Sequence, residues 1–206
     1  KNPGNVPKSI KILAIGNSFS VDAMRNHLYP MLKEAGCTDI RLGILYIGGA
    51  SIDTHYDNVR LDRAKYQYQE TTNGTWNYTE NYKASTAFAL TDWDIVTVQQ
   101  VSHHSGQPQT YVPYLTELVA FVREKCPKAK IYFHQTWAYE IDSDHGGFVN
   151  YNRDQQEMYR RIGDCAAMAC RLIGADVLPS GPVVQYLREN APEFDYKNGG
   201  LSLNRD

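Results

Sequence analysis

Small polar residues and glycines directly follow the short apolar segments of this chain. They are Gly16, Asn17 and Ser18, then Gly48 and Gly49, then Gln99 and Gln100, and last Gln135, Thr136 and Trp137. A serine between a strand and a helix exposes its hydroxyl, and the nearby backbone amides can stabilise a negatively charged oxygen. Ser18 is therefore a candidate nucleophile for acyl transfer. The alternative interpretation is that Ser18 or Ser20 only caps the following helix.

Further donors for such an oxygen come from the other segments. A glycine lets the backbone approach a bound group closely, so Gly49 can offer a second amide. A side-chain amide of Gln99 or Gln100 would be the third donor, and we favour Gln99 because it comes first after its segment.

The elements that must position these residues alternate along the chain. Apolar runs predict strands at residues 11–15, 40–47, 94–98, 130–134 and 176–178. Helical spacing predicts helices at residues 21–35 with a kink at Pro30, at 51–64 capped by Ser51 and Asp53, and at 111–126, 151–173 and 183–189. This order predicts a three-layer α/β/α sandwich with a parallel sheet of about five strands, and its ligands bind beyond the carboxyl ends of the strands.

Residues 66–82 interrupt the rhythm, because polar and aromatic residues alternate there around Asn73 and Gly74. This pattern predicts an inserted β-hairpin. Repeats and linker-like segments are absent from the sequence, so residues 1–206 are expected to form a single domain.

Composition limits the classes of function. Twenty-one Lys and Arg against 23 Asp and Glu give a net charge of −2, which predicts no nucleic-acid partner. The sequence contains no run of about 18 apolar residues, so no membrane span is predicted. No cofactor or metal is expected, and Cys37, Cys126, Cys165 and Cys170 are expected to be buried thiols. Residues 1–5 resemble the end left after a leader is removed, which favours export, with a cytoplasmic location as the alternative.

Aromatic residues make up 12% of the chain, and many lie in polar stretches. Such rings either stack on sugars and flat ligands or cover an edge of the sheet. Trp137 and Tyr139 follow the strand at 130–134 and are expected to form a wall of the substrate pocket. His134 ends that strand, and His103 and His104 follow the strand at 94–98, so all three histidines are candidates for the pocket.

The motif at residues 12–20 resembles the first sequence block of the SGNH (GDSL-like) hydrolases, with Gly16-Asn17-Ser18 in place of the usual Gly-Asp-Ser. Gly49 matches the glycine of the second block, and Gln99 stands where the third block usually has an asparagine. The resemblance implies a flavodoxin-like sheet and an acyl-enzyme at Ser18. It also implies an oxyanion hole made by the amides of Ser18 and Gly49 and the side chain of Gln99, with Asn17 and Gln100 beside it.

The fifth block of that family is Asp-x-x-His, and residues 201–206 resemble the approach to it. Asp206 would orient the catalytic histidine, which is expected just after it. Without that histidine we expect little or no turnover.

Two functions remain open from the sequence. The first is a serine ester hydrolase, either a carbohydrate esterase or deacetylase or a small-acyl esterase, acting on a small-molecule or glycan ester. The second is a non-catalytic glycan-binding module on the same scaffold, with Trp76 and Trp137 making the contacts.

Overall fold

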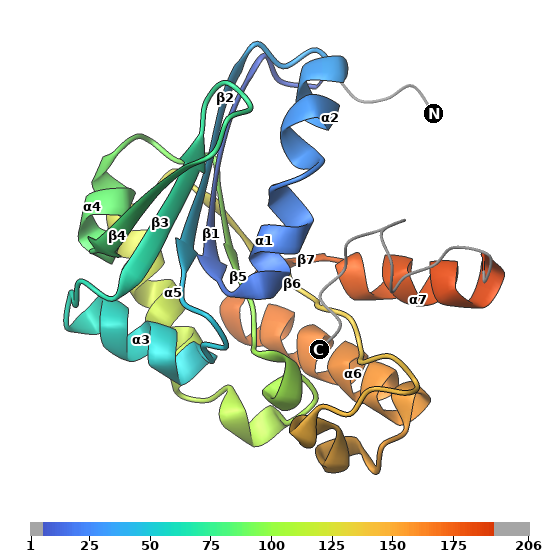
Figure 1. Ribbon diagram of the computed structural model, residues 1–206. Helices are drawn as coiled ribbons and strands as arrows, with labels where there is room; N and C mark the ends of the chain where they lie inside the picture. The colour runs from blue at the N-terminus through green and yellow to red at the C-terminus, as the bar shows by residue number, and fades with distance from the viewer. Residues whose placement is uncertain (1–5, 192–206) are drawn as a thin grey trace.

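The computed structural model describes residues 6–191, which include a seven-stranded sheet between two layers of helices (Figure 1). In spatial order the strands are β4 (Asn77–Tyr82), β3 (Tyr66–Thr71), β2 (Asp39–Tyr46), β1 (Ser9–Gly16), β5 (Ile95–Val98), β6 (Lys130–His134) and β7 (Asp176–Leu178). β2, β1, β5, β6 and β7 run parallel, whereas β3 and β4 pair in antiparallel fashion. The predicted α/β/α sandwich is confirmed, and the predicted hairpin extends the same sheet.

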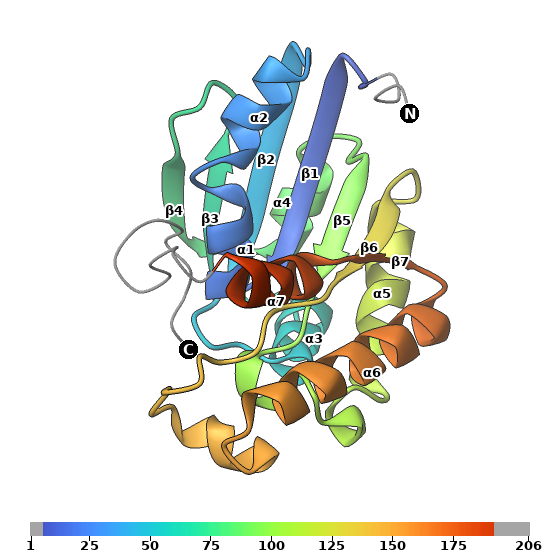
Figure 2. The same ribbon diagram turned by 90° about the vertical axis from the view of Figure 1, so that its right-hand side faces the viewer.

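The helices divide between the two faces of the sheet. One face carries α1 (Ser18–Met24), α2 (Leu28–Glu34) and α7 (Ser180–Asn190), which lie in front of the sheet in Figure 2. The other carries α3 (Ile52–Arg60), α4 (Ala84–Ala89), α5 (Tyr114–Lys125) and α6 (Gln155–Ile173). No helix within residues 6–191 is long and apolar enough to cross a membrane.

Alternating side chains of each strand supply two separate apolar layers. Leu13 and Ile15 of β1 pack with Val96 and Val98 of β5 on the α5 side. Ile12 and Ala14 belong to the layer beneath α1 and α2. Because successive strand residues point to opposite faces, a one-residue slip would exchange the two layers, so both layers fix the register.

The helix predicted at residues 21–35 is in fact two helices, with the break at residues 25–27. Pro30 is the third residue of α2, in the first turn, where the missing N–H costs no helical hydrogen bond. The predicted kink at Pro30 is therefore wrong, since the helix breaks before the proline.

The long helix predicted from residue 151 begins four residues later, at Gln155. A short 3-10 helix, η3 (Gly146–Tyr151), precedes it, and the positive φ angles of Asn152 and Arg153 separate the two. Asp154 starts α6 by accepting a hydrogen bond from the Glu157 amide at 3.0 Å.

Removal of this cap tests how α6 is held. Replacement Asp154→Ala should lower the free energy of unfolding by about 1 kcal/mol, because an amide of the first turn loses its acceptor. Asp154→Asn keeps an acceptor and should stay within a few tenths of wild type. Urea unfolding of the three proteins measures the difference, and equal stability of Asp154→Ala and wild type would contradict the assigned cap.

Candidate active site

Ser18 lies at the junction of β1 and α1, at the carboxyl edge of the sheet. Asn17 occupies the N-cap position, and its Oδ1 accepts from the Phe19 amide at 3.1 Å. Ser18 is the first residue of the helix and is partly exposed, whereas Asn17 and Ser20 are buried. The cap is thus Asn17, and the interpretation of Ser18 or Ser20 as the cap is wrong.

The turn that carries Gly49 is tied to the same edge. The Ile47 amide donates to the Gly16 carbonyl at 3.2 Å, and Asn17 Nδ2 donates to the Ala50 carbonyl at 3.1 Å. Gly49 is exposed and has a φ of +64°, a conformation that other residues rarely adopt. Ser18 and Gly49 therefore lie at one edge of the sheet and both reach solvent. Their convergence on one oxygen stays a prediction.

Gln99 lies buried behind Asn17. Its Nε2 donates to Asn17 Oδ1 at 2.7 Å, and its Oε1 accepts from Ser20 Oγ at 2.6 Å. Asn17 uses one of the two hydrogens of Nε2.

Gln100 has a different role. Its Oε1 accepts from the amides of Ile52 and Val101, and its Nε2 donates to the carbonyl and hydroxyl of Thr110. Both amide hydrogens face Thr110, so Gln100 joins α3 to the turn before α5. The expected place of Gln100 beside the reaction centre finds no support in these contacts.

Gly16 makes room for this arrangement. A Cβ atom at Gly16 would lie 2.2 Å from Ser20 Oγ and 2.8 Å from Gln99 Oε1. Any larger residue would push those two side chains away, so the glycine of the Gly-Asn-Ser motif is required by close packing.

His134 is buried at the end of β6, with 2% of its surface exposed. Its Nδ1 lies 3.3 Å from Gln99 Oε1, and its Nε2 lies 2.9 Å from Ser180 Oγ. Desolvation lowers the pKa of His134 to about 4. Both ring nitrogens are engaged, so His134 is not placed as a base for Ser18, although its side chain lines an apolar cavity beneath α1.

Trp137 and Tyr139 are also buried, at 2% and 0% exposure. Trp137 packs edge-on against Phe19 with 4.5 Å between ring centroids. The Tyr139 hydroxyl donates to Ser102 Oγ at 2.8 Å. These rings support the start of α1 and the loop after β5 from inside, which corrects the expectation of an open aromatic wall.

Three histidines lie together in the loops after β5 and β6. The ring centroid of His103 is 4.2 Å from that of His104 and 6.2 Å from that of His145. Desolvation, with His104 and His145 nearby, lowers the pKa of His103. Within residues 6–191, no three His, Cys, Asp or Glu side chains are placed to hold a metal ion.

The four cysteines are free, and burial raises the pKa of Cys126 and Cys165 to about 11.

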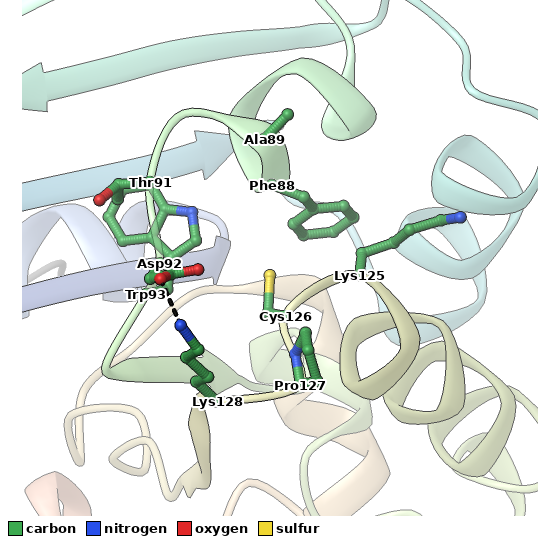
Figure 3. A pocket seen from close by; sticks show the side chains of 9 residues that line it. All are labelled: Phe88, Ala89, Thr91, Asp92, Trp93, Lys125, Cys126, Pro127 and Lys128. Carbon is green, nitrogen blue, oxygen red and sulfur yellow. Dashed lines mark hydrogen bonds and ion pairs between the residues drawn. The ribbon is translucent and has the colours of Figure 1, made fainter.

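Two hollows lie away from Ser18. An apolar cavity of about 390 Å³ faces Ser20, Ala23 and Met24 of α1. Ser18 precedes Ser20 by two residues, which turns it about 200° around the helix, away from this cavity. A second pocket, lined by Trp93, Cys126 and the Asp92–Lys128 ion pair, lies at the amino edge of the sheet (Figure 3).

Asp206 and residues 1–5 lie outside the described residues. The assigned role of Asp206 and the leader interpretation therefore remain predictions.

The family model described as "Domain of unknown function (DUF4886)" matches residues 11–206. A crystal structure of a DUF4886 family protein from Bacteroides uniformis is 37% identical, with a TM-score of 0.84 over 87% of this chain and 70% of that one. The chain belongs to the DUF4886 family. No curated protein is significantly similar to it.

More distant structures relate this DUF4886 chain to the SGNH hydrolases by fold. A proposed SGNH hydrolase from Slackia heliotrinireducens is 19% identical, with a TM-score of 0.59 over 86% of this chain and 83% of that one. A proposed GDSL-like lipase from Parabacteroides merdae is 11% identical, with a TM-score of 0.57 over 96% and 90% of the two chains. The predicted SGNH hydrolase fold is confirmed.

Two members of the hydrogen-bond network in this DUF4886 chain are not predicted from the sequence. The sequence indicates only a capping role for Ser20, and it indicates no role for Ser180. The signal for Ser20 was its place two residues after Ser18 in a motif with Gly16. Ser180 follows the short strand β7 and carries no comparable signal.

The amide of Asn17 can be tested against a carboxylate. Asn17→Asp keeps the acceptor for the Phe19 amide but loses the donor to Ala50 and buries a charge beside that carbonyl. We expect the free energy of unfolding to fall by about 1–3 kcal/mol. The matched control is Asn73→Asp, because the exposed Asn73 Oδ1 only accepts, from the Thr75 amide. Urea unfolding measures both, and an unchanged Asn17→Asp protein would contradict the donor assignment.

Two buried histidines predict acid sensitivity. Desolvation lowers the pKa of both His55 and His134 from 6.5 to about 4, although Asp53 partly offsets this for His55. The unfolded chain therefore binds protons between pH 6.5 and 4 that the folded chain does not. Stability should be retained above pH 6.5 and fall below it, by up to about 1.4 kcal/mol per pH unit for each histidine. Urea unfolding at pH 7 and 5 measures the slope. His55→Phe should reduce it by about half, and an unchanged slope would contradict this origin.

Proposed function

We propose that this protein is a serine ester hydrolase that works through an acyl-enzyme at Ser18. The observation that supports the proposal is that a partly exposed serine and an exposed glycine lie at the same edge of the sheet, in two turns joined by Asn17, which also binds the buried Gln99. The fold shared with SGNH hydrolases supports the same class of reaction.

In the proposed reaction, Ser18 Oγ attacks the ester carbonyl carbon and its proton passes to the general base. The amides of Ser18 and Gly49 and the Gln99 side chain stabilise the negative charge on the carbonyl oxygen. The alcohol leaves with the proton from the base, and water then hydrolyses the acyl-enzyme. We assign the base to the Asp-x-x-His block whose aspartate matches Asp206.

A small-acyl ester or an acetylated sugar is the proposed substrate. The net charge of −2 agrees with a neutral substrate. The acyl group is proposed to be small because the apolar cavity lies on the other side of α1.

The glycan-binding alternative is weakened by the position of its aromatic residues. Trp76 lies in the turn after β3, and this end of β3 pairs with Leu42 in the amino-terminal half of β2. The Trp76 Nε1 donates to the Arg25 carbonyl at 2.9 Å. Trp137 is buried near the opposite edge. The two rings do not form one surface, which favours the esterase over the glycan-binding module.

Hydrolysis of p-nitrophenyl acetate by the full-length gene product tests the proposal. Ser18→Ala should lower kcat by at least about three orders of magnitude, because no other oxygen takes the place of Oγ. The control is Ser85→Ala, which alters an exposed serine in the first turn of α4 and should leave kcat unchanged. Full activity of Ser18→Ala would exclude Ser18 as the nucleophile. If the wild-type protein does not hydrolyse p-nitrophenyl acetate, the esterase function is refuted.

A further inference from the structure

A chain of hydrogen bonds, buried from Asn17 to His134, runs along the carboxyl edge of the sheet from the β2 side to α7. It begins at the Ala50 carbonyl and passes through Asn17, Gln99 and His134 to Ser180. Side chains from three parallel strands or the turns directly after them are thereby joined in one line behind Ser18.

The direction of this chain is set by backbone groups at its start. The Phe19 N–H can only donate, so the Asn17 atom that accepts from it is Oδ1, and Nδ2 is left to donate to the Ala50 carbonyl. The same Oδ1 is 2.7 Å from Gln99, so the Gln99 atom that faces it must be the donor Nε2.

The orientation of Gln99 then determines the tautomer of His134. Gln99 Oε1 can only accept, and it lies 2.6 Å from Ser20 Oγ and 3.3 Å from His134 Nδ1. The hydrogen of the neutral imidazole must therefore be on Nδ1. The unprotonated Nε2 accepts from the Ser180 hydroxyl at 2.9 Å.

This order determines what Gln99 offers to a substrate. If the amide were flipped, its oxygen would face the oxygen of Asn17, and the second Nε2 hydrogen would no longer be available at the site. Ser20 and His134 both donate to Oε1, and both favour the unflipped amide. A donor held in place before the reaction stabilises an oxyanion without the cost of reorienting.

We propose that His134 is a positioning residue, which donates through Nδ1 to Gln99 and holds the Gln99 amide ready for the oxyanion. This inference rests on the proposed esterase function. It gives His134 an effect on kcat that acts through Gln99.

The kinetic test compares two replacements of His134. His134→Leu removes the donor to Gln99 and should lower kcat by about ten- to a hundredfold with KM within about twofold of wild type. This is less than the loss expected from removing an oxyanion donor itself. His134→Asn places an amide N–H close to the position of Nδ1 and should recover kcat to within about threefold of wild type. The control is His27→Leu, an exposed histidine between α1 and α2, which should leave kcat unchanged.

A measurement on the wild-type protein keeps the test independent of folding in the variants. Nitrogen-15 NMR of the histidine rings should show the His134 hydrogen on Nδ1. A hydrogen on Nε2, an unaltered kcat in His134→Leu, or an equal loss in the Asn and Leu variants would each overturn the inference while Ser18-dependent turnover stands. Absence of that turnover in wild type would instead refute the esterase function, and the catalytic role of His134 with it.

Discussion

The carboxyl edge of the sheet depends on the side-chain amide of Asn17. Its oxygen accepts from the first turn of α1 and from Gln99, while its nitrogen donates to the turn after β2. A carboxylate has no hydrogen to donate, so an aspartate could make only the first two of these contacts. The Gly-Asn-Ser form of the motif is therefore explained by a bond that joins β1 to the turn carrying Gly49.

The same amide orders the polar groups behind it. Each hydrogen bond determines which atom of the next side chain donates and which accepts. The order that begins at the Phe19 N–H therefore continues to Ser180, through residues far apart in sequence. Such chains are costly when half satisfied in a buried site, and stabilising when every donor meets an acceptor. Gly16 is part of this condition, because a side chain there would occupy the space of Ser20 and Gln99.

Much of this arrangement could be predicted because strands and their carboxyl ends follow simple rules. The apolar runs located all five parallel strands, and the residues after them marked the edge with Ser18 and Gly49. The two glutamines could not be separated in the same way. Neighbouring strand residues point to opposite faces, so Gln99 turns toward α1 and Gln100 toward α3, and only the pairing of β5 with β1 reveals which is which. The break between α1 and α2 at residues 25–27 could not be predicted either, because the helical spacing of apolar residues continues across it.

The positions of the aromatic residues show why aromatic content alone could not locate a substrate site. β3 runs antiparallel to β2, so the hairpin carries Trp76 away from the edge where β1 and β2 end. Trp137 does reach that edge, but it is packed against Phe19 below Ser18. Burial of this ring stabilises the first turn of α1, because Phe19 is the residue directly after Ser18. The rings thus stabilise the position of Ser18 at the start of α1, and the aromatic content of the chain does not itself mark a surface for a ligand.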